Sequence, residues 1–169
     1  MLNIWYKFVD TNQIGGDPMS LCILAAYMLV TSFVLALWEI QIEGKNGWAK
    51  DLPTWRVSNK LTSLFYGARP LTGYHLYMNI FVLLLLHLPV FFIGWSWELE
   101  CILFGFLIGM WTVEDFLWFV FNPHYGLKKF KKENVPWHKN WWGPVPDFYI
   151  PFAVFSGALL YFGRHCLPW

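Results

Sequence analysis

Two adjacent carboxylates, Glu114 and Asp115, interrupt one of the most apolar stretches of the chain, CILFGFLIGMWTVEDFLWFVF at residues 101–121. A carboxylate is expensive to place in hydrocarbon, so such residues in membrane proteins face the interior of a helix bundle and have partners there. Carboxylates bind metal ions, exchange protons or act as general bases. The two side chains differ by about 100° around a helix, so Asp115 can contact a different partner from Glu114. The pair indicates either a functional site or a polar contact that holds helices together.

Other polar residues recur at helical spacing in two more apolar stretches. Glu39 and Glu43 are four residues apart, and so are His75 and Asn79, so each pair shares one face of a helix. His138 follows in the segment PWHKNWW, where the neighbouring tryptophans are typical of a membrane interface. We therefore expect these residues and the carboxylate pair to meet at one level of a bundle.

Carboxylates and imidazoles are ligands that zinc, iron and manganese take in proteins. We expect a divalent metal ion, zinc, iron or manganese, as the cofactor. The predicted ligands are Glu39, Glu43, His75, Glu114 and His138. A coordination position left open to water would acidify that water, and Asp115 is the predicted catalytic general base. The hypothesis is a metal-dependent membrane enzyme, a hydrolase or an oxidoreductase, that acts on a lipid or another apolar substrate.

Three other interpretations of the same residues stay open. The polar cluster can be purely structural, because polar side chains also join helices in membranes. In that interpretation Glu114 or Asp115 bonds to Asn79, Arg56, Arg69 or backbone groups. It can be a proton or ion relay, the role that intramembrane charges have in pumps and transporters. It can also bind metal without catalysis, in an assembly or transport subunit, and a transporter with so few helices would need to be a homo-oligomer. The sequence contains neither the HExxH motif of metalloproteases nor the paired Glu-x-x-His of di-iron bundles.

The composition indicates the environment of these residues. The chain is 57% hydrophobic, only 14% charged and contains 12 tryptophans, whereas charged residues make up about a quarter of a soluble domain. We therefore expect an integral membrane protein in which residues 1–169 form a single transmembrane domain in contact with membrane lipids. The net charge of +1 argues against nucleic acid as a partner, because binding it requires many positive charges.

Stretches of about 20 mostly apolar residues are long enough to cross a bilayer as helices. The sequence has four such stretches or near matches, at residues 19–42, 72–94, 97–121 and 147–163. Thr72 and Ser96 are the predicted N-caps of the second and third, and Asn122-Pro123 ends the third. The predicted fold is an all-α bundle of four transmembrane helices, with interfacial helical segments in its long connections. One such segment is VSNKLTSLFYG at 57–67, whose apolar residues recur at helical spacing.

Lysine and arginine residues predict the orientation in the membrane. Five lie in each of the two long connections, residues 43–71 and 122–146, and the other two of the 12 lie on the opposite side. By the positive-inside rule, both long connections are cytoplasmic and both termini are on the non-cytoplasmic side. Asn79 and Glu114 are each seven residues from the predicted cytoplasmic ends of their helices, which places them about 10 Å deep. The polar residues of three helices are therefore expected to meet in one chamber near the cytoplasm.

Overall fold

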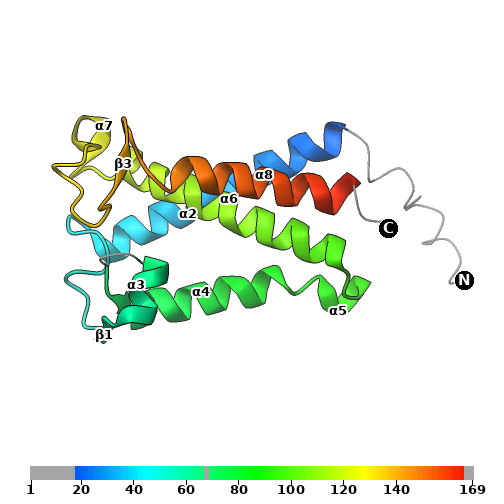
Figure 1. The fold of residues 1–169 in the computed structure, drawn as a ribbon, viewed down its shortest axis with the longest axis horizontal. Coiled ribbons are helices and arrows are strands. Elements are labelled where there is room, and N and C mark those ends of the chain that lie inside the picture. Colours follow the sequence, from blue (N-terminus) through cyan, green and yellow to red (C-terminus); the bar gives the residue numbers. More distant parts are fainter. Residues whose placement is uncertain (1–17, 67–68, 166–169) are drawn as a thin grey trace, which may run out of the picture.

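The computed structural model describes residues 18–66 and 69–165, and Figure 1 shows how the elements are arranged. The described part of the chain is mostly helical. Its helices are α2 (Pro18–Glu43), α3 (Lys60–Tyr66), α4 (Gly73–Leu86), α5 (Val90–Ile93), α6 (Trp97–Phe121), α7 (Gly126–Lys129) and α8 (Tyr149–His165). Short antiparallel ribbons complete it, in which β1 (Arg56–Val57) pairs with β2 (Leu71–Thr72) and β3 (Trp141–Trp142) pairs with β4 (Val145–Pro146).

Within the described residues, three helical stretches are long and apolar enough to cross a membrane, Leu21–Glu43, Gly73–Ile93 and Trp97–Phe121. They coincide with the first three predicted spans. α8 has 17 residues, which at 1.5 Å per residue give about 26 Å, slightly less than the hydrocarbon thickness of a bilayer. The fourth predicted span, 147–163, is thus a helix of marginal length, and its crossing of the membrane stays a prediction.

The helices begin at the predicted capping residues. Thr72 Oγ1 accepts a hydrogen bond from the backbone N–H of His75 at 3.1 Å, and Ser96 Oγ accepts one from Leu99 at 3.2 Å. The second predicted span is interrupted, because α4 ends three residues before Pro89, which has no N–H to donate and precedes the short α5. The cap at Thr72 fixes His75 in the first turn of α4.

The predicted helix in the first long connection forms as α3, residues 60–66. Asn59 Oδ1 accepts a hydrogen bond from the backbone N–H of Thr62 at 2.8 Å, and Thr62 Oγ1 accepts one from Asn59 at 2.9 Å. This reciprocal arrangement is a capping box, which explains where the helix begins. Residue 67 of the predicted segment lies outside the described residues, and contact of α3 with a bilayer stays a prediction.

α6 is the central helix, since it packs along α8 and α2 and touches α4 only at a few points (Figure 1). Glycines let α8 come close, because a Cβ on Gly105 would lie 2.9 Å from Leu160 Cγ and one on Gly163 would lie 2.7 Å from the Glu98 carbonyl oxygen. Small residues allow the same close approach between helices in membrane proteins. Ser156 Oγ donates a hydrogen bond to the Gly105 carbonyl oxygen at 2.6 Å, which joins the two helices.

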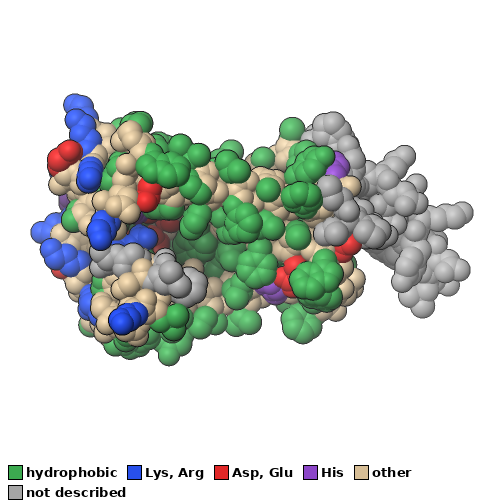
Figure 2. Space-filling view, in the orientation of Figure 1, with side chains coloured by type: hydrophobic (Ala, Val, Ile, Leu, Met, Phe, Trp, Pro, Cys, Tyr) green, Lys and Arg blue, Asp and Glu red, His purple; other side chains and the backbone are tan. Residues whose placement is uncertain are grey.

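The surface separates into an apolar body and a charged end. Figure 2 shows hydrophobic side chains along the helices and Lys and Arg side chains gathered at one end. We call this end, formed by residues 44–60 and 122–148, the basic end. α2 begins and α8 ends at the opposite end of the molecule (Figure 1). The two long connections thus lie together, as the lysine and arginine pattern predicts.

The connection after α6 folds back over the end of that helix. Phe119 and Val135 are buried there, and the ring of Trp137 stacks on Phe119 with centroids 5.9 Å apart. Asn122 Nδ2 donates a hydrogen bond to the Gly44 carbonyl oxygen at 2.8 Å. These contacts join the ends of α2 and α6 and fix the acidic residues that those ends carry.

Candidate functional site

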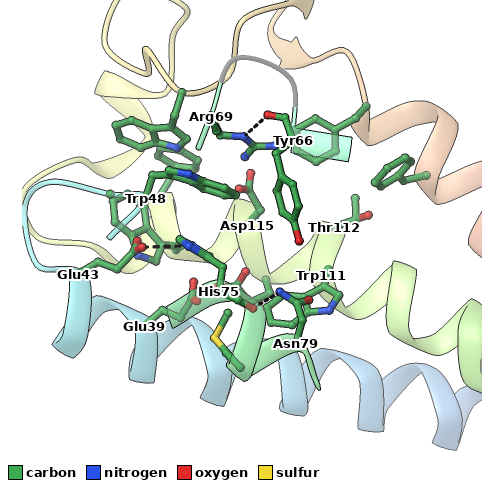
Figure 3. Close-up of a pocket in the computed structure, with 18 residues that line it drawn as sticks. Glu39, Glu43, Trp48, Tyr66, Arg69, His75, Asn79, Trp111, Thr112 and Asp115 are labelled. Carbon is green, nitrogen blue, oxygen red and sulfur yellow. Dashed lines mark hydrogen bonds and ion pairs between the residues drawn. The ribbon is translucent and has the colours of Figure 1, made fainter. Parts of the chain in front are cut away.

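A cavity of about 240 Å³ lies between α2, α4 and α6, just inside the basic end. Aromatic rings form much of its wall, among them Trp48, Trp111 and Trp118. Five of the six predicted site residues line it, and three helices supply them. They are Glu39 and Glu43 on α2, His75 on α4, and Glu114 and Asp115 on α6. The structure therefore brings together, from three helices, residues that are expected from the sequence to meet at one level of a bundle (Figure 3).

The side chains of Glu39 and Glu114 lie against each other between α2 and α6. Both are buried, with 7% and 4% of their surface exposed. Tyr74 donates its hydroxyl to Glu39 Oε1 at 3.2 Å, whereas Glu114 Oε1 has no hydrogen-bond partner among the described residues. Two buried carboxyl groups in contact cannot both be ionised without a cation, so they share a proton or hold a positively charged group.

His75 is held by the residue that caps its helix. Its Nδ1 lies 2.7 Å from Thr72 Oγ1, and its Nε2 lies 3.6 Å from Glu43 Oε1, which is beyond normal hydrogen-bond length. Glu43 Oε1 accepts a hydrogen bond from the backbone N–H of Ala49 at 2.5 Å. The ring of Trp48 stacks on His75 with centroids 4.1 Å apart. His75 therefore has a fixed ring orientation, with one nitrogen facing the carboxyl group of Glu43.

The turn after α2 is strained where it makes these contacts. Trp48 and Ala49 have φ angles of 61° and 51°, in the left-handed region that residues other than glycine rarely occupy. The indole Nε1–H of Trp48 donates to the Pro70 carbonyl oxygen at 2.9 Å, and the Arg69 guanidinium lies 4.0 Å from the centroid of the same ring. Backbone strain of this kind is concentrated at functional sites.

Arg69 brings a positive charge to the cavity. Its Nε donates to the Tyr66 carbonyl oxygen at 3.2 Å, and its Nη groups have no hydrogen-bond partner in the described part of the chain. Burial lowers the pKa of the Arg69 guanidinium, and the charge of Asp115 opposes that shift. Figure 3 shows Arg69 and Tyr66 on one side of the cavity and Glu39 and His75 on the other. The cavity thus has an acidic side at Glu39 and a side where the Arg69 guanidinium lies near Asp115.

Asp115 also lines the cavity but has partners of its own. Its Oδ2 accepts a hydrogen bond from the Tyr149 hydroxyl at 2.5 Å and lies 3.0 Å from His138 Nε2. His138 is buried against Phe148, with ring centroids 5.3 Å apart, and its Nδ1 has no partner among the described residues. The predicted ligand His138 therefore lies behind Asp115. It is not one of the described residues that line the cavity.

No three histidine, cysteine or acidic side chains of the described residues are arranged so that they could hold a metal ion. The predicted ligands that come nearest to sharing one are His75 and Glu43. Two ligand atoms on one tetrahedral zinc ion are about 3.3 Å apart, and the Nε2 and Oε1 atoms of this pair are 3.6 Å apart. The metal ion stays a prediction, and it requires further side chains to turn towards these two.

The cavity reaches the side of the molecule as well as the basic end. Met78 on α4, Phe148 just before α8 and Phe152 on α8 line it, and Phe152 is 47% exposed on the apolar surface. Figure 2 shows the surface hollowed beside the basic end, with hydrophobic side chains along the hollow. The lining of the cavity is therefore continuous with the apolar surface at Phe152.

The sequence did not indicate that Trp48 or Tyr149 belongs to the site, whereas Arg69 is one of the partners that the structural interpretation offers for Glu114 or Asp115. Arg69 precedes the N-cap Thr72 by three residues, which places it near the first turn of α4. Tyr149 has no helical spacing to Asp115, so the sequence offers no signal for their contact. Trp48 reaches His75 only through the strained turn.

Comparisons with protein-family models, with curated proteins and with solved structures found no match to this chain. Three features of the cavity are therefore the basis for inferring a function. They are its acidic side, its arginine side and its opening to the apolar surface.

Proposed function

We propose that this chain is an integral membrane protein with four spanning helices, α2, α4, α6 and α8, and that the basic end is cytoplasmic. The apolar body and the gathering of Lys and Arg at one end support this (Figure 2). α8 packs along α6, and apolar residues on its outer face, such as Val154, are exposed. α2 and α4 also carry exposed apolar residues. A helix of its length crosses a bilayer that thins locally around it. Both termini then lie on the non-cytoplasmic side.

We further propose that the cavity binds the headgroup of a membrane lipid and hydrolyses an ester bond in it. One observation carries this proposal. Asp115, held by His138 and Tyr149, lines a cavity that opens to the apolar surface at Phe152. The cavity of about 240 Å³ is smaller than the ~300–1,000 Å³ of ordinary ligand pockets. It has room for a headgroup, while acyl chains would remain outside.

The residues of the cavity have separate roles in this mechanism. Asp115 is the general base, because His138 and Tyr149 fix one of its oxygens and Oδ1 makes no hydrogen bond with any described residue. Oδ1 would take a proton from the water that attacks the ester, the bond between the ester centre and its alcohol oxygen would break, and the alcohol would leave with the proton returned by Asp115. Arg69 stabilises the negative charge that develops there. The Glu39–Glu114 pair binds a positively charged group of the substrate in place of the proton that it shares when the cavity is empty.

The experiment is turnover of a total lipid extract by the purified full chain, followed by mass spectrometry of the lipids. Asp115→Asn should lower the rate by at least about 100-fold, because positioned general bases contribute about 10²–10⁴-fold. Asp51→Asn, an exposed aspartate at the same end, should leave it unchanged. A parent protein without turnover would end the enzyme proposal, and an active Asp115→Asn variant would move the base elsewhere.

A metal-dependent version of this enzyme is the second candidate. His75 favours this candidate, because Thr72 Oγ1 contacts one ring nitrogen and the other nitrogen lies 3.6 Å from Glu43. Histidine ligands of metal ions are held in the same way, by a hydrogen bond to the nitrogen that does not bind the metal. The test is the metal-to-protein ratio of protein purified without a metal-binding tag. Bound zinc, iron or manganese that is lost in His75→Ala would support a metal site here. A parent that binds none, even after incubation with each ion, would contradict it.

A further inference from the structure

We infer that the headgroup taken by the cavity is phosphoethanolamine, a phosphate ester that ends in a primary ammonium group. The inference rests on the lipid-binding role proposed above and adds the chemical class of the headgroup. It is carried by the acidic side and the Arg69 side of the cavity and by the hydrogen-bonding atoms that remain unpartnered among its described residues.

The acidic side suits a primary ammonium group. Glu39, Glu43 and Glu114 line this part of the cavity, and Glu114 Oε1 is a buried atom without a partner among the described residues. The N–H donors of a primary ammonium can bond to Glu39 and Glu114, which lie against each other, and its charge would replace the proton shared by this pair. A quaternary ammonium such as choline has no N–H, so it would leave Glu114 Oε1 unpartnered.

The opposite side of the cavity suits a phosphate. The Nη groups of Arg69 have no hydrogen-bond partner within the described residues. The buried indole Nε1–H groups of Trp111 and Trp118 line other parts of the cavity, without a partner in the part of the chain described, and Figure 3 shows Trp111 beside Asn79. A phosphate offers several acceptor oxygens, and arginine binds two of them at once. Buried donors without an acceptor are costly, so a ligand with several acceptor oxygens would relieve that cost in this cavity.

Other lipid classes match only one side. A headgroup with phosphate and glycerol would leave the carboxyl groups without a cation, and a cationic lipid without phosphate would leave Arg69 without an acceptor. The opening at Phe152, which is 47% exposed on the apolar surface, gives acyl chains a way out of the cavity. The intact phospholipid, rather than soluble phosphoethanolamine, is therefore the ligand that the cavity fits.

The experiment is native mass spectrometry of the purified full chain in detergent with three dioleoyl phospholipids at equal concentration. Their headgroups are phosphoethanolamine, phosphocholine and phosphoglycerol, so the acyl chains are constant. We expect the ethanolamine lipid to be retained at least about tenfold more than either of the others, because its N–H groups bond charged acceptors. Soluble phosphoethanolamine at the same concentration should not displace it.

Variants assign this preference to the two sides. Glu114→Gln should bring the ethanolamine and choline lipids to within about twofold of each other, because an ionisable acceptor is lost. Arg69→Gln should weaken both by about tenfold, and Arg69→Lys should weaken them less, because it keeps the charge. Asp51→Asn is the control that should leave all ratios unchanged. The thermal unfolding midpoint of each variant shows that it is folded when its lipids are measured.

Equal retention of ethanolamine and choline lipids by the parent, or displacement by soluble phosphoethanolamine, would overturn the inference. Selective retention of the glycerol lipid would also overturn it, while leaving the lipid-binding role in place. Ethanolamine-selective binding without turnover would support the headgroup assignment and contradict the enzymatic proposal. The two claims therefore fail on different results.

Discussion

Replacing Tyr149 by phenylalanine removes one hydroxyl group and leaves the ring in place. The hydroxyl donates to Asp115 Oδ2 at 2.5 Å, and the ring packs on Phe148 and Phe130 with centroids 5.0 and 6.1 Å apart. A hydrogen bond to an ionised group contributes about 1.5–3 kcal/mol in soluble proteins, whereas interhelical hydrogen bonds in membranes average about 0.6 kcal/mol and reach about 1.7. Since Asp115 keeps its contact with His138, we expect the free energy of unfolding to fall by about 1–2 kcal/mol.

The assay is reversible unfolding by sodium dodecyl sulfate in mixed micelles, followed by tryptophan fluorescence. Tyr161→Phe is the matched control, because Tyr161 lies on the same helix and is 59% exposed; it should stay within about 0.5 kcal/mol of the parent. In an Asp115→Asn background, Tyr149→Phe should cost about 1 kcal/mol less than in the parent, since the charged acceptor is gone. Equal costs in both backgrounds would refute the proposed hydrogen bond.

The same substitution separates an orienting role of Tyr149 from a purely structural one. If His138 and Tyr149 orient Asp115 for catalysis, Tyr149→Phe should lower kcat for the lipid substrate by about tenfold and leave KM unchanged. A structural role would lower only the amount of folded protein. A variant with lower stability and parental kcat would contradict the orienting role.

Two further predictions test the topology and the packing of the helices. Cysteines are placed at Ser58 or Lys131 in a background without native cysteines. In intact cells they should react only with a membrane-permeant thiol reagent, because both positions lie at the basic end, which is proposed to be cytoplasmic. Labelling by an impermeant reagent would contradict the cytoplasmic orientation. Gly163→Ala should lower the free energy of unfolding by about 1–3 kcal/mol, because its Cβ would lie 2.7 Å from a backbone carbonyl oxygen of α6. Gly157→Ala should leave the free energy of unfolding unchanged, because its Cβ would meet nothing within 4 Å. Equal losses of stability in the two variants, measured by the SDS titration, would refute the close packing of α8 on α6.

The arrangement of the apolar stretches was sufficient to predict that Glu39, His75 and Glu114 would lie at one level. The positive-inside rule brings the ends of their helices to one side, and Thr72 and Asn122-Pro123 mark two of these ends, from which a helix rises 1.5 Å per residue. That argument requires no knowledge of which helices touch. It could not predict that Glu39 and Glu114 lie in contact, since contact depends on how α2 rotates about its own axis against α6.

The connections could not be predicted in the same way. His138 and Arg69 are positioned by segments without a repeating pattern, and aromatic packing and a strained turn at Trp48 determine their path. The orientation of Asp115 away from Glu114 was predicted, because adjacent helical residues differ by about 100°. Its partners His138 and Tyr149 come from the connection and the next helix, where no periodicity relates them to it.

The Glu39–Glu114 pair allows the most direct measurement of the chemistry of the cavity. Dicyclohexylcarbodiimide enters membranes and reacts with protonated carboxyl groups in apolar surroundings, so mass spectrometry of peptides from the treated protein shows which carboxyl group holds a proton. We expect the label on Glu114 or Glu39 in lipid-free protein, and about tenfold less label once dioleoyl phosphatidylethanolamine occupies about nine-tenths of the sites. Dioleoyl phosphatidylglycerol should give no such protection. Label that is confined to Glu98 and Glu100, or that is the same with and without the ethanolamine lipid, would contradict a cation-binding carboxyl pair in a lipid-accessible cavity.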